Sequence, residues 1–118
     1  MKLPSVSMNV FLHRASVDFR KSIDGLGAIV QEELKLDLFA ANLFVFCCSR
    51  RKRLKILYWD KTGFALWYKR LESERFPWPR CEDSDVVELT IEQLQWLLEG
   101  IDIWAIKPHR PKIYKKIC

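Results

Sequence analysis

Residues 43–70 read LFVFCCSRRKRLKILYWDKTGFALWYKR and contain three short apolar runs separated by polar links. The runs cover 43–48, 54–59 and 64–70, and each is rich in the aromatic and β-branched side chains that favour strands. The second link, Asp60 to Gly63, suits a tight turn, because Gly tolerates positive φ and Asp bonds to the backbone that follows it. Consecutive strands with short links predict an antiparallel meander.

Two more strands and two helices are expected around this meander. Short apolar runs predict strands at 9–13 and 86–89. Apolar residues at spacings of three and four predict a long helix from near Phe19 to Leu34. A Thr-Ile-Glu-Gln capping box predicts a shorter helix from Ile91 to Glu99, with Gly100 as its stop. The predicted fold class is therefore α+β, an antiparallel β-meander of three to five strands packed with one long and one shorter helix.

The long helix contains features that its apolar pattern does not explain. Asp18 or Ser16 is in position to cap its start. Gly25 and Gly27 lie inside it, and each costs about 1 kcal/mol relative to Ala in a helix interior. Packing rather than propensity must hold this helix, and we expect another segment to approach its backbone closely.

The length of 118 residues fits one compact domain. We expect this domain to cover 1–106, with 107–118 as a basic, flexible C-terminal tail. No run approaches the roughly 20 apolar residues that span a bilayer, and the first residues do not form a secretory signal. These features predict a soluble protein in the cytoplasm, with no membrane partner.

Charge is distributed in blocks along the chain, although the net charge is only +5. Residues 47–70 hold eight basic side chains and one acid, whereas 71–106 hold nine acids and two basic side chains. Such asymmetry is typical of a protein that meets a polyanion with one face and a basic partner with another. The alternative is that the acidic block neutralises the basic block within the folded domain.

The link between the first two strands of the meander is the most basic stretch of the sequence. Clustered cations on a protruding hairpin can neutralise several phosphates and release the counterions condensed on them. The alternative is a solvated, self-repelling turn. The residues predicted to contact nucleic acid are Arg50, Arg51, Lys52, Arg53, Lys55, Lys69 and Arg70.

Aromatic residues interleave with the cations that follow this link. Such a mixture can stack on bases or form a protein interface, although most of these rings are expected in the core. Because alternate side chains of a strand face opposite ways, we expect Trp67 to pack and Tyr68 to be exposed together with Arg70. The residues predicted to bind a partner are Tyr68, Phe76 and Trp78.

The sequence offers little support for catalysis or metal binding. Cys47 and Cys48 are adjacent, while Cys81 and Cys118 are isolated, so free thiols are expected rather than a zinc site. A magnesium-dependent nuclease would need converging carboxylates, for which the candidates are Asp18, Asp24, Asp60 and Glu99. We expect no enzymatic activity, no cofactor and no small-molecule substrate.

Three motifs in fixed order carry a resemblance to a known family: Tyr-Trp-Asp, Leu-Trp-Tyr-Lys-Arg and Phe-Pro-Trp-Pro, within 58–79. The chain resembles TnpB, the accessory protein of the insertion-sequence-sixty-six family of bacterial transposons. Further matches lie at 18–26, 43–46 and 97–102, whereas Leu38 stands where the family usually has Pro. The name TnpB is also used for a much larger RNA-guided nuclease, to which this chain shows no similarity.

The resemblance implies a protein encoded beside a separate acidic-triad transposase that it supports during transposition. Transposon DNA and that transposase are the expected partners. One hypothesis is DNA binding through the basic hairpin. The alternative is a protein-interaction module that docks on the transposase through the helix from Ile91 to Glu99 or through the segment from Phe76 to Pro79. A metal-dependent nuclease is the third hypothesis, and the oligomeric state stays open.

Overall fold

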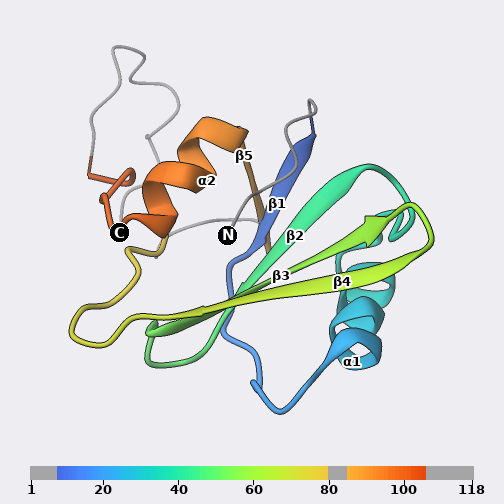
Figure 1. Cartoon of the computed structure of the whole chain (residues 1–118), viewed down its shortest axis with the longest axis horizontal. Helices are drawn as coiled ribbons and strands as arrows, with labels where there is room; N and C mark the ends of the chain where they lie inside the picture. Colours follow the sequence, from blue (N-terminus) through green and yellow to red (C-terminus); the bar gives the residue numbers. More distant parts are fainter. Residues whose placement is uncertain (1–7, 80–84, 106–118) are drawn as a thin grey trace.

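The structure is a computed structural model that describes residues 8–79 and 85–105, so the predicted basic tail lies outside the described residues. In the described part, five strands form one sheet with helical segments packed on it (Figure 1). None of these helices is long and apolar enough to span a membrane. The elements in chain order are β1 (Asn9–His13), α1 (Ile23–Ala28), the π-helical η1 (Ile29–Glu33), β2 (Asn42–Cys47), β3 (Arg53–Asp60), β4 (Gly63–Arg70), β5 (Val86–Leu89) and α2 (Ile91–Leu98).

The sheet has the strand order β4-β3-β2-β1-β5. Strands β2, β3 and β4 form the predicted antiparallel meander, and β5 pairs antiparallel with β1. Strand β1, however, pairs parallel with β2, so the prediction of a purely antiparallel sheet is wrong. The chain between β1 and β2 crosses one face of the sheet through α1 and η1, and such a crossover returns the chain in its original direction (Figure 1).

Apolar side chains cover both faces of the sheet in two separate clusters. On the face covered by α1 and η1, which we call the α1 face, Phe44, Phe46 and Leu57 pack with Leu26 and Val30 of the helix. On the opposite face, the α2 face, the buried residues of β1, β2 and β3 pack against α2 and the segment 76–78. The domain therefore has three layers, with the sheet between the two helical layers (Figure 1).

The first helix differs from its prediction at its start and in its length. It begins at Ile23 rather than Phe19, with Ser22 as an N-cap that makes no side-chain bond, and it ends as η1 at Glu33. Asp18 does not cap it and binds Arg20 instead. The carbonyls of Phe19 and Lys21 accept hydrogen bonds from Lys55, which fixes this segment before the helix, and the Ser22 carbonyl accepts from the Leu26 N–H.

The close approach expected at the helical glycines is present. A Cβ added to Gly27 would lie 3.0 Å from Cδ2 of Leu38, which is buried in the α1-face cluster.

The second helix, α2, has the predicted capping box: Oγ1 of Thr90 accepts from the Gln93 N–H at 3.0 Å, and Oε1 of Gln93 accepts from the Thr90 N–H at 2.9 Å. Gly100, with φ of 88°, follows the end of this helix.

We predict that Gly27→Val lowers the free energy of unfolding by about 1–3 kcal/mol, because the added methyl groups overpack the contact with Leu38. Urea unfolding measures the change. Leu38→Ala also destabilises the protein, but it makes room at Gly27, so the double variant should lose less than the two single losses together. Strictly additive losses would contradict the close packing of these two residues.

Candidate nucleic-acid interface

A tight turn, and not an extended loop, connects β2 to β3. The Cys48 N–H donates to the Arg53 carbonyl at 3.1 Å, and the Arg51 N–H donates to the Cys48 carbonyl at 3.0 Å. Arg51 has φ of 64°, in the left-handed region. The turn is also tied to the segment after β4, because the Leu71 N–H donates to the Lys52 carbonyl. The four consecutive cations are therefore held on a compact, hydrogen-bonded turn.

The two adjacent cysteines are free thiols in different environments. Cys47 lies in the α2-face cluster, where burial raises its pKa to about 12. Burial also disfavours the thiolate of Cys48, but hydrogen bonds from the backbone of Arg53, Lys52 and Arg50 outweigh burial and lower the pKa of Cys48. The backbone of the turn therefore favours the thiolate form of Cys48.

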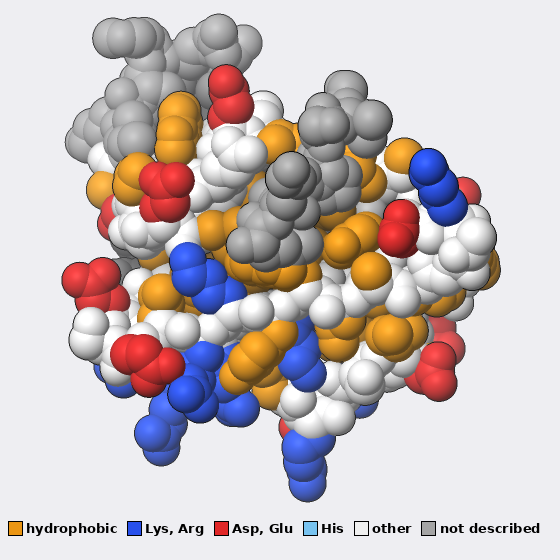
Figure 2. Space-filling model, viewed as in Figure 1, with side chains coloured by type: hydrophobic (Ala, Val, Ile, Leu, Met, Phe, Trp, Pro, Cys, Tyr) orange, Lys and Arg blue, Asp and Glu red, His pale blue; other side chains and the backbone are white. Residues whose placement is uncertain are grey.

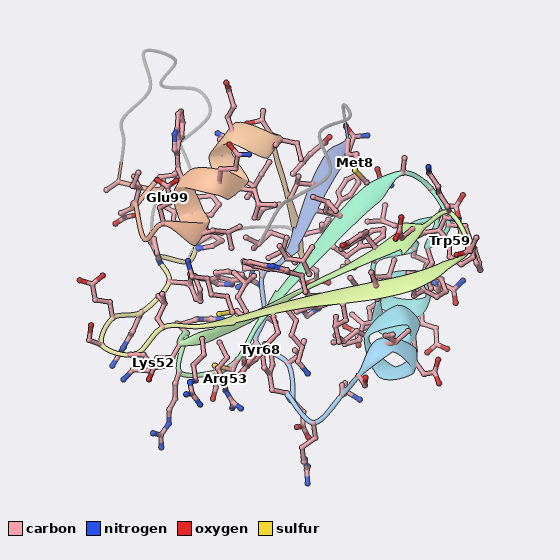
Figure 3. All side chains as sticks on the ribbon, viewed as in Figure 1. Met8, Lys52, Arg53, Trp59, Tyr68 and Glu99 are labelled. Atoms are coloured by element: carbon pink, nitrogen blue, oxygen red, sulfur yellow. The ribbon has the colours of Figure 1, made fainter. Side chains whose placement is uncertain are left out.

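Arg50 and Lys52 are the cations of the turn that stay free in the described part of the chain. Arg50 is exposed and Lys52 is half-buried. Neither side chain forms an ion pair or hydrogen bond with another described residue. Lys52 and Arg53 lie at one end of the β3–β4 hairpin, close to Tyr68, while Trp59 lies at the other end (Figure 3).

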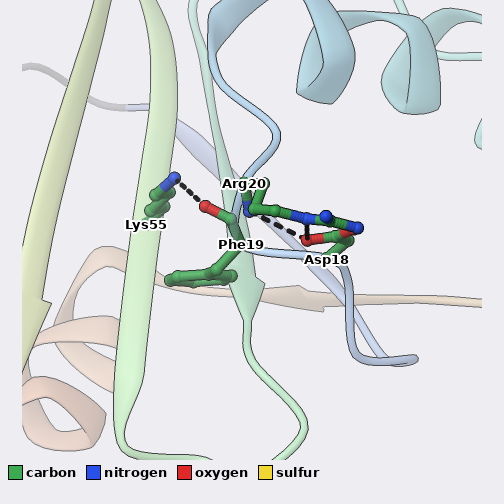
Figure 4. Close-up of polar contacts among 4 residues, drawn as sticks. All are labelled: Asp18, Phe19, Arg20 and Lys55. Carbon is green, nitrogen blue, oxygen red and sulfur yellow. Dashed lines mark hydrogen bonds and ion pairs between the residues drawn. The ribbon is translucent and has the colours of Figure 1, made fainter.

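Arg53 and Lys55 both pack on the ring of Phe19. The Cζ atom of Arg53 lies 5.3 Å from the ring centroid, and Nζ of Lys55 lies 4.7 Å from it. Lys55 also donates to the carbonyls of Phe19 and Lys21 at 2.9 Å each (Figure 4 draws the first of these bonds), and burial lowers its pKa. Lys55 therefore anchors residues 18–21 to β3, while Arg53 remains exposed above the ring.

Three other predicted phosphate ligands have partners of their own. The guanidinium of Arg51 lies over Trp78 at 5.4 Å, with its Nη1 atom buried and without a hydrogen-bond partner among the described residues. Nζ of Lys69 donates to the Leu98 carbonyl at 2.9 Å, at the end of α2. Arg70 is exposed and pairs with Glu72 at 3.1 Å. Arg51, Lys55 and Lys69 thus have partners within the fold, and their role in nucleic-acid contact stays a prediction.

Of the three aromatic residues predicted to bind a partner, one is exposed and two are buried. Tyr68 is 48% exposed, and its ring centroid lies 6.4 Å from that of Phe19. Trp67 packs against the α2-face cluster, as expected from strand alternation. Phe76 and Trp78 are buried in that cluster, and Nε1 of Trp78 donates to the Arg14 carbonyl. Both rings are enclosed by the described chain, and their contact with a partner stays a prediction.

Residues 18–21 are a part of this surface that the sequence reasoning missed. Phe19 brings Arg20 and Lys21 beside β3, and both side chains are exposed. A bidentate pair with Arg20 lowers the pKa of Asp18 (Figure 4). Figure 2 shows Lys and Arg side chains gathered along the lower edge of the molecule. We call this the basic surface, and it consists of Arg20, Lys21, Arg50, Lys52, Arg53 and Arg70 around Phe19 and Tyr68.

Comparison with known proteins identifies the family. The family model described as IS66 Orf2 like protein matches residues 8–108. The chain belongs to the IS66 Orf2-like family. It is 34% identical over 104 residues to a Sinorhizobium fredii protein named "Uncharacterized protein y4jC", covering 88% of each chain. It is 38% identical over 101 residues to "Uncharacterized protein y4hO" of the same organism, covering 85% of this chain and 87% of the relative. No solved structure matches.

The family match spans the basic surface and also the carboxylates considered for a nuclease. Within residues 8–79 and 85–105, no group of three His, Cys, Asp or Glu side chains is placed to hold a metal ion. Asp18, one of the four candidates, is paired with Arg20. The nuclease hypothesis therefore has no candidate metal centre in this part of the family member.

The sequence gives little indication that residues 18–21 belong to the basic surface, because they lie some 30 positions before the basic turn. Two adjacent cations beside an aromatic residue, in a block of balanced charge, are all that marks them. The residues 18–26 do belong to the segments that carried the family resemblance. That resemblance gave no reason to place them next to β3.

We predict that Lys55→Met lowers the free energy of unfolding by about 1–3 kcal/mol, because two carbonyls lose their donor. Arg50→Gln should change it by less than about 0.5 kcal/mol, because Arg50 is exposed and has no partner among the described residues. Urea unfolding compares the two variants. Equal stability of both would contradict the division between structural and free cations.

Proposed function

We propose that this member of the IS66 Orf2-like family supports transposition by binding DNA in the cytoplasm through the basic surface, without catalysing a reaction itself. The observation that carries the proposal is that Arg50 and Lys52 have no ion pair within the described chain, while Arg53 is held exposed beside them. Family membership supports a role in the life cycle of an insertion sequence.

The arrangement suits a phosphate backbone. Duplex DNA carries about one negative charge per 1.7 Å of its axis, so several cations on one edge can each meet a phosphate. Arg53 packs over Phe19, which restricts its motion and reduces the entropy that it loses on binding. The salt bridges of Arg20 and Arg70 are exposed, and exposed pairs contribute only about 0–1 kcal/mol, so both guanidinium groups can exchange their carboxylate for a phosphate.

Internal neutralisation of the charge blocks is the competing interpretation. Asp85, Glu88, Glu92 and Glu99 lie in the described part of the acidic block, and none of them pairs with a cation of the basic turn. Among the described residues of the acidic block, Glu72, directly after β4, pairs with the basic surface through Arg70. This separation supports the availability of the turn to an external anion.

We predict that the double variant Arg50→Gln, Lys52→Gln binds duplex DNA more weakly and depends less on salt. Each lost phosphate contact should reduce the slope of log affinity against log salt by about 0.9. Fluorescence anisotropy at several salt concentrations measures both quantities.

The matched control is Lys35→Gln, Lys61→Gln, which removes two exposed cations that lie outside the basic surface. This control should leave affinity and slope nearly unchanged. The same loss in both double variants would mean that net charge, and not the basic surface, determines binding.

A second candidate function is docking on the transposase, and one observation favours α2 as the docking element. Trp96 and Ile101 are 44% and 42% exposed at this helix and its C-terminal end. Exposed acidic side chains of Glu92 and Glu99 lie on the same helix and its cap. Exposed large apolar residues with an acidic rim fit a partner surface that is apolar and basic.

We predict that Trp96→Ala weakens binding to the transposase of the same element at least about 30-fold, the loss of a hot-spot residue. Co-purification after nuclease treatment, followed by titration of the two purified proteins, measures it. The Arg50→Gln, Lys52→Gln variant should retain this binding, because its substitutions lie in the basic surface and not on the acidic helix α2. Binding that disappears with nuclease treatment would rule out direct docking.

A further inference from the structure

Strand β4 forms one edge of the sheet, and its outer side pairs with no described residue. All eight of its residues pair one-to-one with β3, without a bulge. In an antiparallel ladder, alternate residues direct their N–H and C=O groups to the same side, so about half of the residues of β4 direct these groups outward. Such an edge can accept a further strand.

The features that usually protect an edge strand are missing from the middle of β4. Proline, bulges, short length and inward-pointing charges are the common protections. Residues 64–68, FALWY, are uncharged and contain no proline. Lys69 is the first charged residue, and its amine is turned toward the Leu98 carbonyl. The opposite edge, β5, has only four residues.

Exposed aromatic side chains lie near both ends of this edge. Phe39 is 55% exposed and packs against Trp59 and Phe64, with ring centroids 5.2 and 5.3 Å away, near the β3–β4 turn. Tyr68 is exposed near the other end (Figure 3). Phe64 and Tyr68 project from the same face of the strand, because they are four residues apart.

We propose that two copies of this chain pair antiparallel through β4 and join their five-stranded sheets into one. In a two-fold antiparallel pair, directly opposed residues share a face of the sheet. Tyr68 of each copy then comes beside the Phe39–Phe64 contact of the other. The exposed apolar side chains at the two ends of the strand thereby cover each other.

Charge favours the antiparallel arrangement with a second copy. The Tyr68 end of β4 carries Arg53 and Arg70, of which Arg70 pairs with Glu72. The turn end carries the exposed acids Asp37 and Asp60 against one exposed cation, Lys61, and neither acid is in an ion pair with a described residue. Antiparallel pairing places each basic end beside the acidic end of the other copy. Parallel pairing would place the two basic ends together.

The dimer would separate the two basic surfaces by about the length of β4, roughly 27 Å for eight residues at about 3.4 Å each. Both would lie on the same side of the joined sheet. One turn of duplex DNA is about 34 Å long, so such a spacing suits two contacts on one face of a duplex. This consequence rests on the proposed DNA binding, whereas the dimer itself does not.

Sedimentation of the full chain without DNA, over about a hundred-fold range of concentration, tests the pairing, because the dimer fraction follows mass action. Hydrogen exchange at the two ends of that range locates the interface. We expect a dimer at high concentration. The amides of β4 should be protected from exchange only at high concentration, and the exchange of the β5 amides should not change. A monomer at every concentration, or a dimer whose β4 amides exchange as fast as in the monomer, overturns the proposal.

A charge reversal provides the second test. Asp37→Lys together with Asp60→Lys places cations beside the basic end of the other copy and should weaken dimerisation about tenfold. Glu88→Lys with Glu92→Lys is the matched control, with two exposed acids on β5 and α2, and it should leave the dimer unchanged. Equal dimerisation of the two double variants overturns the antiparallel arrangement. DNA affinity is measured separately, so failure of the dimer and failure of DNA binding are distinguishable.

Discussion

Strand β2 must be covered on both faces, and this requirement organises the domain. Its residues 43–47 are all buried, with alternate side chains in the two clusters. Exposing either set would forfeit about 1.5–3 kcal/mol for each large apolar side chain. The strand therefore needs a neighbour on each side, supplied by β1 and β3, and a helical layer on each face. The basic turn follows directly from the end of this fixed strand.

The conformation of that turn decides which cations remain available. Lys55 and Lys69 donate to main-chain carbonyls, and Arg51 covers the ring of Trp78. A Lys amine has three donors and a long stem, so it can fix a loop or a helix end as readily as it can bind phosphate. Chemically similar residues in one basic segment thus have separate tasks. Strand alternation separates Lys69 from Arg70, whereas Lys55 and Arg53 share a face and differ in their hydrogen bonds.

Short sequence patterns predicted the elements that depend on interactions between residues close in the sequence. The five strands and α2 lie within one or two residues of their predicted bounds, because apolar runs and the capping box act over a few residues. The parallel β1–β2 pair depends on a crossover, and the segment before α1 is bonded to Lys55, which is distant in sequence. The same limit applies to the site. Strand alternation predicted the exposed Tyr68, whereas Trp78 lies in an irregular segment in which no periodicity marks the buried rings.

Strand β4 directs side chains to both faces of the sheet. Its residues alternate, so Tyr68 and Arg70 join the basic surface, while Trp67 and Lys69 contact the α2-face cluster and the end of α2. Two ligands on opposite faces would therefore meet the same strand, and DNA binding and protein docking are compatible on one small domain. Because β4 is also an edge of the sheet, a strand that pairs with it would lie beside side chains of both faces.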